Sequence, residues 1–387
     1  MKQLPFAASL LAASMTLGLS QAQASFTVGN TDISFGGFVK LDMMLNDTPD
    51  GNLGTNIGRD FYVPSLTPVG GEGESTKFDM HARQSRFFFT TQTKLENGKT
   101  VGGRLEFDMM STPGGDQRIS NGYSPGIRHA FFTYDKWLFG QTWSTFMDLT
   151  SLPESVDFVG NTDGQIFVRQ PQVRYTNGSF QFAIENPEST ITPSPDGGRV
   201  VSDDNTMPDV VARYNHSAEW GSLSLSGLVR QLAYEDRALQ INDRVMGYGL
   251  SLTGKVMVTD SNDIRFTINT GKGLGRYIGL NTSNGAVLDA NGELQAIQST
   301  GMTLAYRHVW DENWRTNLIY ATLRVDNDEE LTGLSATKST ESLSANMMYQ
   351  ASRHLQFGVE FRHATRKLES GADGDLNRLQ FMAKYDF

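Results

Sequence analysis

Arginines and carboxylates that alternate with apolar residues are the side chains of this sequence that could do chemistry. In one segment, Arg104, Glu106 and Asp108 alternate with Leu105 and Phe107. The basic residues at such polar positions are Lys40, Arg86, Arg104, Arg213, Arg230, Arg265, Arg307, Arg315, Arg362, Arg378 and Lys384, and the carboxylates are Asp42, Glu106, Asp108, Glu360 and Asp386. Guanidinium groups bind carboxylates through paired N–H donors. The basic excess therefore favours reversible binding of anions.

A narrow aqueous passage would strengthen this attraction, because its low-dielectric walls raise the local potential. We therefore expect six of the basic residues to line such a passage and bind solute, namely Lys40, Arg86, Arg104, Arg213, Arg265 and Arg307. The alternative is that each arginine pairs with a carboxylate of the wall or of a loop and only keeps the interior wet.

The sequence offers no recognisable set of catalytic or metal-binding residues. It contains no Cys, its six His residues form no H-E-x-x-H pattern, and it lacks a G-x-S-x-G motif. The acidic runs 326–330 and 373–375 could hold Ca²⁺, but they lack the spaced ligands of an EF-hand loop, so solvated loop charge is the favoured interpretation. We predict no catalytic residue, no metal site and no cofactor.

Charge and hydropathy narrow the class of protein that could carry this pattern. The 387 residues include 43 Asp and Glu against 33 Lys and Arg, for a net charge of −10. A nucleic-acid-binding protein needs a basic surface, so this class is excluded. The mean hydropathy is negative, which excludes a bundle of membrane helices. A membrane β-barrel stays possible, because only alternate residues of its strands face lipid.

The alternation has a period of two residues over segments of about ten, which is typical of strands with one apolar face. In the last segment Leu379, Phe381 and Tyr385 share one phase, whereas Arg378 and Lys384 share the other.

Short and long connections follow one another between these segments. Asn97-Gly98 and Asn177-Gly178 are strong signals for tight hairpins. The long connections lie near residues 47–80, 110–126, 144–170, 187–207, 233–243, 272–298, 325–338 and 367–375. Eight long and seven short connections predict an all-β fold, a transmembrane antiparallel β-barrel of about 16 strands with short periplasmic turns and long extracellular loops.

The first 24 residues predict an export signal rather than part of the fold. Lys2 precedes an apolar stretch from Leu4 to Leu19, and Ala22-Gln23-Ala24 forms an A-x-A cleavage site. A membrane anchor is the alternative. We expect residues 1–24 to be a signal peptide and residues 25–387 to form a barrel in the outer membrane of a Gram-negative bacterium.

The connection after Trp143 is the third long loop, and we expect it to fold into the lumen. It carries the predicted constriction residues Asp148, Glu154, Asp157, Asp163 and Arg169. Its carboxylates would then face arginines of the wall and orient dipolar solutes. The alternative is a loop that stays on the outer surface.

Several motifs in the first quarter of the mature chain resemble the DcaP-like trimeric outer-membrane porins. They are Gly36-Gly37-Phe38-Val39-Lys40-Leu41-Asp42, the stretches 59–65 and 69–71, and His81-Ala82-Arg83-Gln84-Ser85-Arg86-Phe87. The resemblance implies a sixteen-stranded homotrimer that passes small, often anionic organic solutes such as dicarboxylates.

Together these features predict a passive porin and not an enzyme. Its expected partners are small anionic solutes, membrane lipid, lipopolysaccharide and further copies of the chain, with no role for nucleic acid. The alternative is a barrel with an occluded lumen that acts as an adhesin or a structural protein.

Overall fold

The computed structural model describes residues 24–73, 76–112 and 117–387. The predicted signal peptide lies outside the described residues except for Ala24. Within the described part of the chain, no helix is long and apolar enough to cross a membrane.

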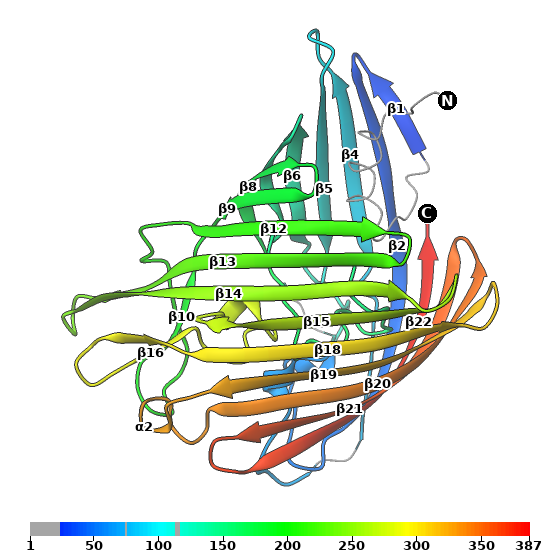
Figure 1. Cartoon of the computed structure of the whole chain (residues 1–387). Coiled ribbons are helices and arrows are strands. Elements are labelled where there is room, and N and C mark those ends of the chain that lie inside the picture. Colours follow the sequence, from blue (N-terminus) through cyan, green and yellow to red (C-terminus); the bar gives the residue numbers. More distant parts are fainter. Residues whose placement is uncertain (1–23, 74–75, 113–116) are drawn as a thin grey trace.

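Sixteen antiparallel strands form a closed ring (Figure 1). In ring order they are β2 (Thr31–Asp47), β4 (Arg86–Lys94), β5 (Thr100–Asp108), β6 (Gly126–Tyr134), β7 (Trp137–Trp143), β8 (Arg169–Asn177), β9 (Phe180–Glu185), β12 (Asp209–Ala218), β13 (Gly221–Asp236), β14 (Ile241–Met257), β15 (Asp263–Lys272), β18 (Gln298–Val309), β19 (Trp314–Asp326), β20 (Thr337–Ser352), β21 (Leu355–Leu368) and β22 (Asp373–Asp386). The ring closes where β22 pairs with β2, with Leu41 opposite Ala383. The predicted barrel of about 16 strands is confirmed.

Two short strands accompany the ring near its closure. β1 (Ala24–Val28) forms a hairpin with the start of β2, and β3 (Lys77–His81) pairs with the end of β2 on the side of β4. β3 and β4 are therefore two halves of one barrel strand, interrupted at residues 82–85. β1 is not predictable from the sequence pattern, because a strand of five residues is too short to show a clear alternation.

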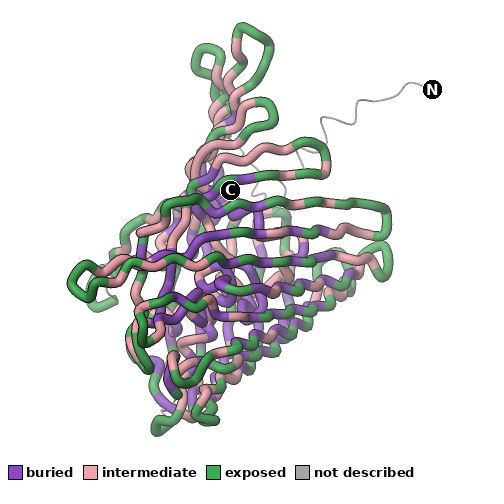
Figure 2. The backbone as a smooth tube through the Cα atoms, turned by 60° about the vertical axis from the view of Figure 1, so that its left-hand side comes forward, coloured by how far each residue is buried: buried purple, intermediate pink, exposed green. Residues whose placement is uncertain are grey.

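The alternation of side chains explains why these segments form a barrel. Leu304 and Phe361 point outward and are 54% and 50% exposed, whereas Arg362 and Arg378 point inward and are 1% exposed. Figure 2 shows buried and exposed positions alternating along the strands. An apolar exterior around a charged interior is the arrangement of a barrel that sits in lipid. Closure is required there, since an open sheet edge would leave backbone groups unpaired in lipid.

Short turns lie at one end of the barrel and the long connections at the other (Figure 1). Two predicted long loops are wrong. β13 and β14 continue until Asp236 pairs with Ile241, and β21 and β22 continue until Lys367 pairs with Asp373, so each connection is a four-residue turn. These strand ends carry polar residues, which are typical of loops in sequence, because a strand that extends beyond the apolar band needs no apolar face.

The remaining elements lie in the long connections. β10 (Ser189–Thr192), β11 (Val200–Ser202), β16 (Ala286–Leu288) and β17 (Leu294–Ala296) form a separate four-stranded sheet, and η1 (Ile57–Arg59), η2 (Pro64–Leu66), η3 (Gly275–Tyr277) and α2 (Glu329–Thr332) are single turns of helix. The small sheet packs on the barrel through a cluster that includes Ile191, Leu232 and Leu294. The small sheet thus joins the connections 186–208 and 273–297, and it contacts β13 and β14.

Candidate functional site

The connection 144–168 between β7 and β8, here called the inward loop, contacts the inner face of much of the barrel. Its first part reaches β12 and β14: Arg213 donates to the Met147 carbonyl at 2.7 Å and to Asp148 at 3.0 Å, and Thr253 donates to Asp148 at 2.7 Å. Arg265 on β15 donates to the Leu152 carbonyl. Arg213 and Arg265 on this part of the wall, β12 to β15, thus bind the inward loop.

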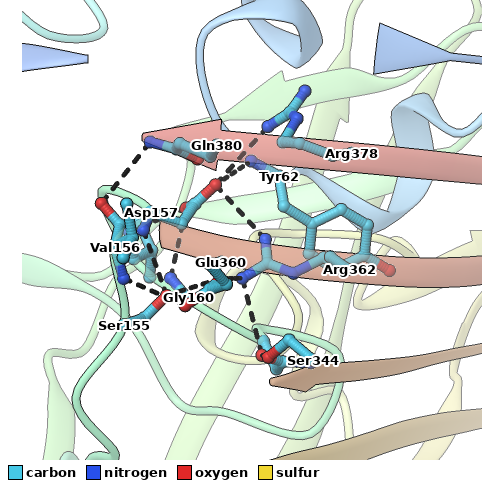
Figure 3. Close-up of polar contacts among 12 residues, drawn as sticks. Tyr62, Ser155, Val156, Asp157, Gly160, Ser344, Glu360, Arg362, Arg378 and Gln380 are labelled. Carbon is cyan, nitrogen blue, oxygen red and sulfur yellow. Dashed lines mark hydrogen bonds and ion pairs between the residues drawn. The ribbon is translucent and has the colours of Figure 1, made fainter. Parts of the chain in front are cut away.

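The middle of the inward loop is anchored to β21 and β22 by a buried group of charges (Figure 3). The Asp157 carboxylate lies 3.2 Å from Nη1 of Arg362 and 3.4 Å from Nη1 of Arg378, and it accepts a hydrogen bond from the Tyr62 amide at 3.0 Å. Burial alone would raise the pKa of Asp157, but the charges of the two arginines outweigh it and hold the pKa below its usual value. The carboxylate therefore stays charged and fixes the loop.

Neighbouring residues extend this anchor to β2. The Glu360 carboxylate accepts from the Ser155 hydroxyl at 2.8 Å and from the Val156 amide at 2.9 Å. Lys40 donates to the Val156 carbonyl at 2.6 Å and forms an ion pair with Asp42 at 2.9 Å. Lys40 is 3% exposed, so its ammonium group is occupied by the loop and by the wall.

The last part of the inward loop returns across the barrel. The Tyr62 hydroxyl donates to Asp163 at 2.8 Å, and the Ser342 hydroxyl on β20 donates to the other oxygen of that carboxylate. Asn269 on β15 donates to the Gly164 carbonyl at 2.7 Å. Burial raises the pKa of Asp163, although the hydroxyl groups of Ser342, Thr340 and Tyr62 oppose this shift. Burial and the nearby Asp163 carboxylate raise the pKa of Tyr62 well above its usual value.

A different stretch of the wall, β4 to β6 with the start of β8, carries a group of arginines here called the basic arc: Arg86, Arg104, Arg128 and Arg169. Within the described residues, the inward loop forms no hydrogen bond with β4, β5 or β6. The Phe158 ring of the loop lies 5.4 Å from the Arg128 guanidinium on β6. Among the described residues, the basic arc is therefore a part of the wall to which the inward loop is not hydrogen-bonded.

Three of the four guanidinium groups of the basic arc share two carboxylates. Glu106 lies 2.9 Å from Arg128, 2.5 Å from Arg104 and 3.4 Å from Arg86, and Asp108 lies 2.7 Å from Arg128 and 3.6 Å from Arg86. Arg169 lies 4.7 Å above the Trp143 ring, and its Nη1 atom is buried without a hydrogen-bond partner among the described residues. The group thus keeps an excess of positive charge.

The basic arc also keeps some contact with solvent. The side chains of Arg86 and Arg104 are 22% and 25% exposed, whereas Arg128 is 5% exposed. Arg86 stacks on Phe38 at 5.2 Å and Arg104 on Phe88 at 4.2 Å. Stacking on an aromatic ring fixes a guanidinium while it leaves N–H donors free. The arc can therefore offer oriented donors to a passing anion.

Comparison with known proteins identifies the family. A profile described as DcaP outer membrane protein matches residues 20–387. The chain belongs to this family. The crystal structure of the outer membrane channel DcaP of Acinetobacter baumannii is 25% identical to the chain, with a TM-score of 0.78 over 94% of this chain and 100% of that one. Among curated proteins, none matches the chain.

More distant solved structures share the fold. An anion-selective porin from Comamonas acidovorans is 10% identical, with a TM-score of 0.55 over 92% of this chain and 100% of that one. OmpT of Vibrio cholerae in its trimer form is 10% identical, with a TM-score of 0.55 over 93% of this chain and 100% of that one. Family and fold place the chain in the outer membrane as a porin-type channel.

In this DcaP family member, the wall residues singled out from the sequence fall into three groups. Lys40, Arg213 and Arg265 hold the inward loop, and Arg86 and Arg104 belong to the basic arc. Arg307 pairs with Asp263 at 2.8 Å near the short-turn end, on the other side of the ring. The six candidates are therefore not one site.

The predicted constriction residues also separate. Asp148, Asp157 and Asp163 face the wall and are bonded to it, and Glu154 pairs with Arg315 at 2.7 Å. Arg169 begins β8 and belongs to the basic arc. The sequence analysis missed Arg128, because a β-bulge in β6 opposite Glu106 and Phe107 turns both Arg128 and its neighbour His129 inward.

Proposed function

We propose that the chain is a passive diffusion channel that prefers small anionic organic solutes, with carboxylates as the favoured class. The observation that carries this proposal is the basic arc, in which three guanidinium groups share two carboxylates and the fourth, that of Arg169, has no ion-pair partner among the described residues. The carboxylates of the loop do not cancel this charge, because Asp148 and Asp157 are bound to other arginines.

The same proposal covers the assembly and its orientation. A signal peptide is cleaved after Ala24, the short turns face the periplasm, and three copies associate in the outer membrane among lipid and lipopolysaccharide. Support for the trimer comes from the family resemblance, and support for the orientation comes from the common architecture of outer-membrane barrels.

Planar-bilayer recording of the purified protein tests the channel and its selectivity together. Stepwise openings with a reversal potential of the anion-selective sign in a KCl gradient are the expected result. A cation-selective reversal potential would contradict the anion preference. Silence under all voltages would contradict the channel itself and favour the alternative of an adhesin or structural barrel with an occluded lumen.

Liposome swelling then tests the solute class. Proteoliposomes should swell faster in sodium succinate than in an isosmotic solution of a neutral solute of similar size, such as erythritol. Equal rates for the two would show that size alone governs passage.

A further inference from the structure

A recess in the inner wall at the short-turn end lies far from the basic arc. It has a volume of about 290 Å³, and its lining includes Glu154, Arg307, Val309, Arg315 and the turn 311–314. The side chains come from β18, β19 and the inward loop. In ring order β18 stands nearly opposite β5, so the recess and the basic arc lie on opposite sides of the lumen.

Two arginines of this recess are held side by side by the strand register. Arg315 pairs with Val309 across β18 and β19, and Arg307 pairs with Asn317, which makes the two arginines diagonal neighbours. Diagonal neighbours of this kind have Cα atoms about 7–8 Å apart. Both arginines line the recess, so a small solute bound there would meet two guanidinium groups.

Each arginine is fixed through its Nε atom. Nε of Arg307 lies 2.8 Å from Asp263, and Nε of Arg315 donates to Glu154 at 2.7 Å. Nη2 of Arg307 donates to the Ser261 carbonyl at 3.1 Å, whereas the described residues provide no hydrogen bond to either Nη atom of Arg315. The outer edge of the Arg315 guanidinium is therefore oriented and available for a bidentate carboxylate contact.

Cations and carboxylates both surround the recess. Asp263 is shared by three cations, with Arg265 at 2.7 Å, Arg307 at 2.8 Å and Lys255 at 3.8 Å. The Asp311 carboxylate at the rim accepts from the amides of residues 313 and 314 and is exposed, as is Glu312. The lining thus carries three carboxylates, those of Glu154, Asp311 and Glu312, beside the two arginines. The carboxylate that competes directly for Arg315 is Glu154, which is 32% exposed.

We propose that this recess is a second anion subsite, at which a solute carboxylate displaces Glu154 from Arg315. The inference rests on the proposed function and extends it, since a solute would pass from the basic arc to a second binding point near the periplasmic opening. Because Glu154 belongs to the inward loop, binding at the recess exchanges one contact of that loop for a contact with solute.

Block of the open channel by sodium succinate, added to one chamber at a time, tests this subsite. For wild-type protein we expect stronger block from the short-turn side. Arg315→Gln should weaken this block about tenfold, because hydrogen bonds to charged groups are among the stronger ones in proteins. Glu154→Gln should strengthen it by removing the competitor. Arg353→Gln, which removes an exposed charge from another short turn, is the matched control and should change nothing.

Equilibrium binding of succinate to the detergent-solubilised barrel gives a second reading that needs no conduction. A succinate affinity lowered by Arg315→Gln and raised by Glu154→Gln supports the subsite even if the bilayer shows a silent or cation-selective protein, which would contradict the proposed function alone. An anion-selective channel in which Arg315→Gln, Glu154→Gln and Arg353→Gln all behave like wild type in block and binding would overturn the subsite and leave the proposed function intact.

Discussion

Nη1 of Arg362 on β21 lies 3.2 Å from the carboxylate of Asp157 in the inward loop, and both side chains are sealed from solvent. Arg378 on β22 approaches the same carboxylate at 3.4 Å. A loop that narrows a pore must keep one position while solutes pass. Here a buried charge group does this, because two arginines of a polar wall would be costly to leave without a partner.

Asp157→Asn should therefore release the middle of the inward loop. The amide keeps an oxygen for the Val159 and Gly160 amides, but its NH₂ group would face the two guanidinium groups. Removing one partner of a buried ion pair costs about 3–5 kcal/mol. We expect noisier single-channel currents and a lower unfolding temperature, read from the heat-dependent shift in gel mobility.

Asp260→Asn, at an exposed position in a short turn, is the control for this change. If Asp157→Asn matches Asp260→Asn in current noise and in unfolding temperature, the buried charge group does not hold the loop.

The barrel itself was predictable from the sequence, because the physical cause of the pattern is local. Each strand must show apolar side chains to lipid and polar ones to the lumen, so Leu304 and Arg307 fall on opposite phases of β18 whatever the rest of the chain does. Strand ends beyond the apolar band do not face lipid, so their side chains need not alternate between apolar and polar. For that reason the sequence predicts long loops near 233–243 and 367–375, where the structure has the short turns 237–240 and 369–372.

Arg86 and Arg104 are expected to set the ion selectivity of the channel. A unit charge about 4 Å from a passing ion contributes about 1 kcal/mol in water, or about fivefold in relative permeability. Arg86→Gln and Arg104→Gln should each lower the ratio of chloride to potassium permeability by about this factor, measured as the reversal potential in a KCl gradient. Lys136→Gln on an exposed short turn should leave the ratio unchanged. Equal ratios for all three variants would remove the basic arc from the solute path.

Asp163 should make the stability of the protein depend on pH in a direction opposite to Asp157. The pKa of Asp163 is raised, so its contribution to stability is present below its usual pKa of 3.8 and is lost as the pH rises through the raised value. The pKa of Asp157 is lowered, so its contribution is present above 3.8 and is lost as the pH falls through the lowered value.

Asp163→Asn removes the pH dependence of stability that comes from the raised pKa of Asp163. Its amide oxygen can still accept from the Tyr62 hydroxyl, and its NH₂ group can donate to Ser342. The variant should unfold at a higher temperature than wild type at pH 7, and the difference should shrink as the pH approaches 4. A variant that is less stable than wild type by the same amount at both pH values would show that the Asp163 carboxylate is needed in its charged form.

The sequence could not predict which arginines bind the inward loop and which belong to the basic arc. Arg213 and Arg104 occupy the same kind of position in their strands, yet Arg213 binds the inward loop and Arg104 does not. The path of the loop decides this, and contacts such as Ser155 with Glu360 join residues that are 205 positions apart. Local alternation carries no information about such pairs.

Gly164→Ala should narrow the channel. The Cβ atom of an alanine at this position would overlap the main-chain oxygen of Met302 on β18, because the loop and the strand meet there backbone to backbone. Since a barrel strand cannot yield, the loop must move toward the lumen, at a cost of about 1–3 kcal/mol for overpacking. We expect a lower single-channel conductance and slower liposome swelling. Gly198→Ala, where an added Cβ meets nothing within 4 Å, is the matched control. Equal conductance in the two variants would mean that the segment around Gly164 does not border the open passage.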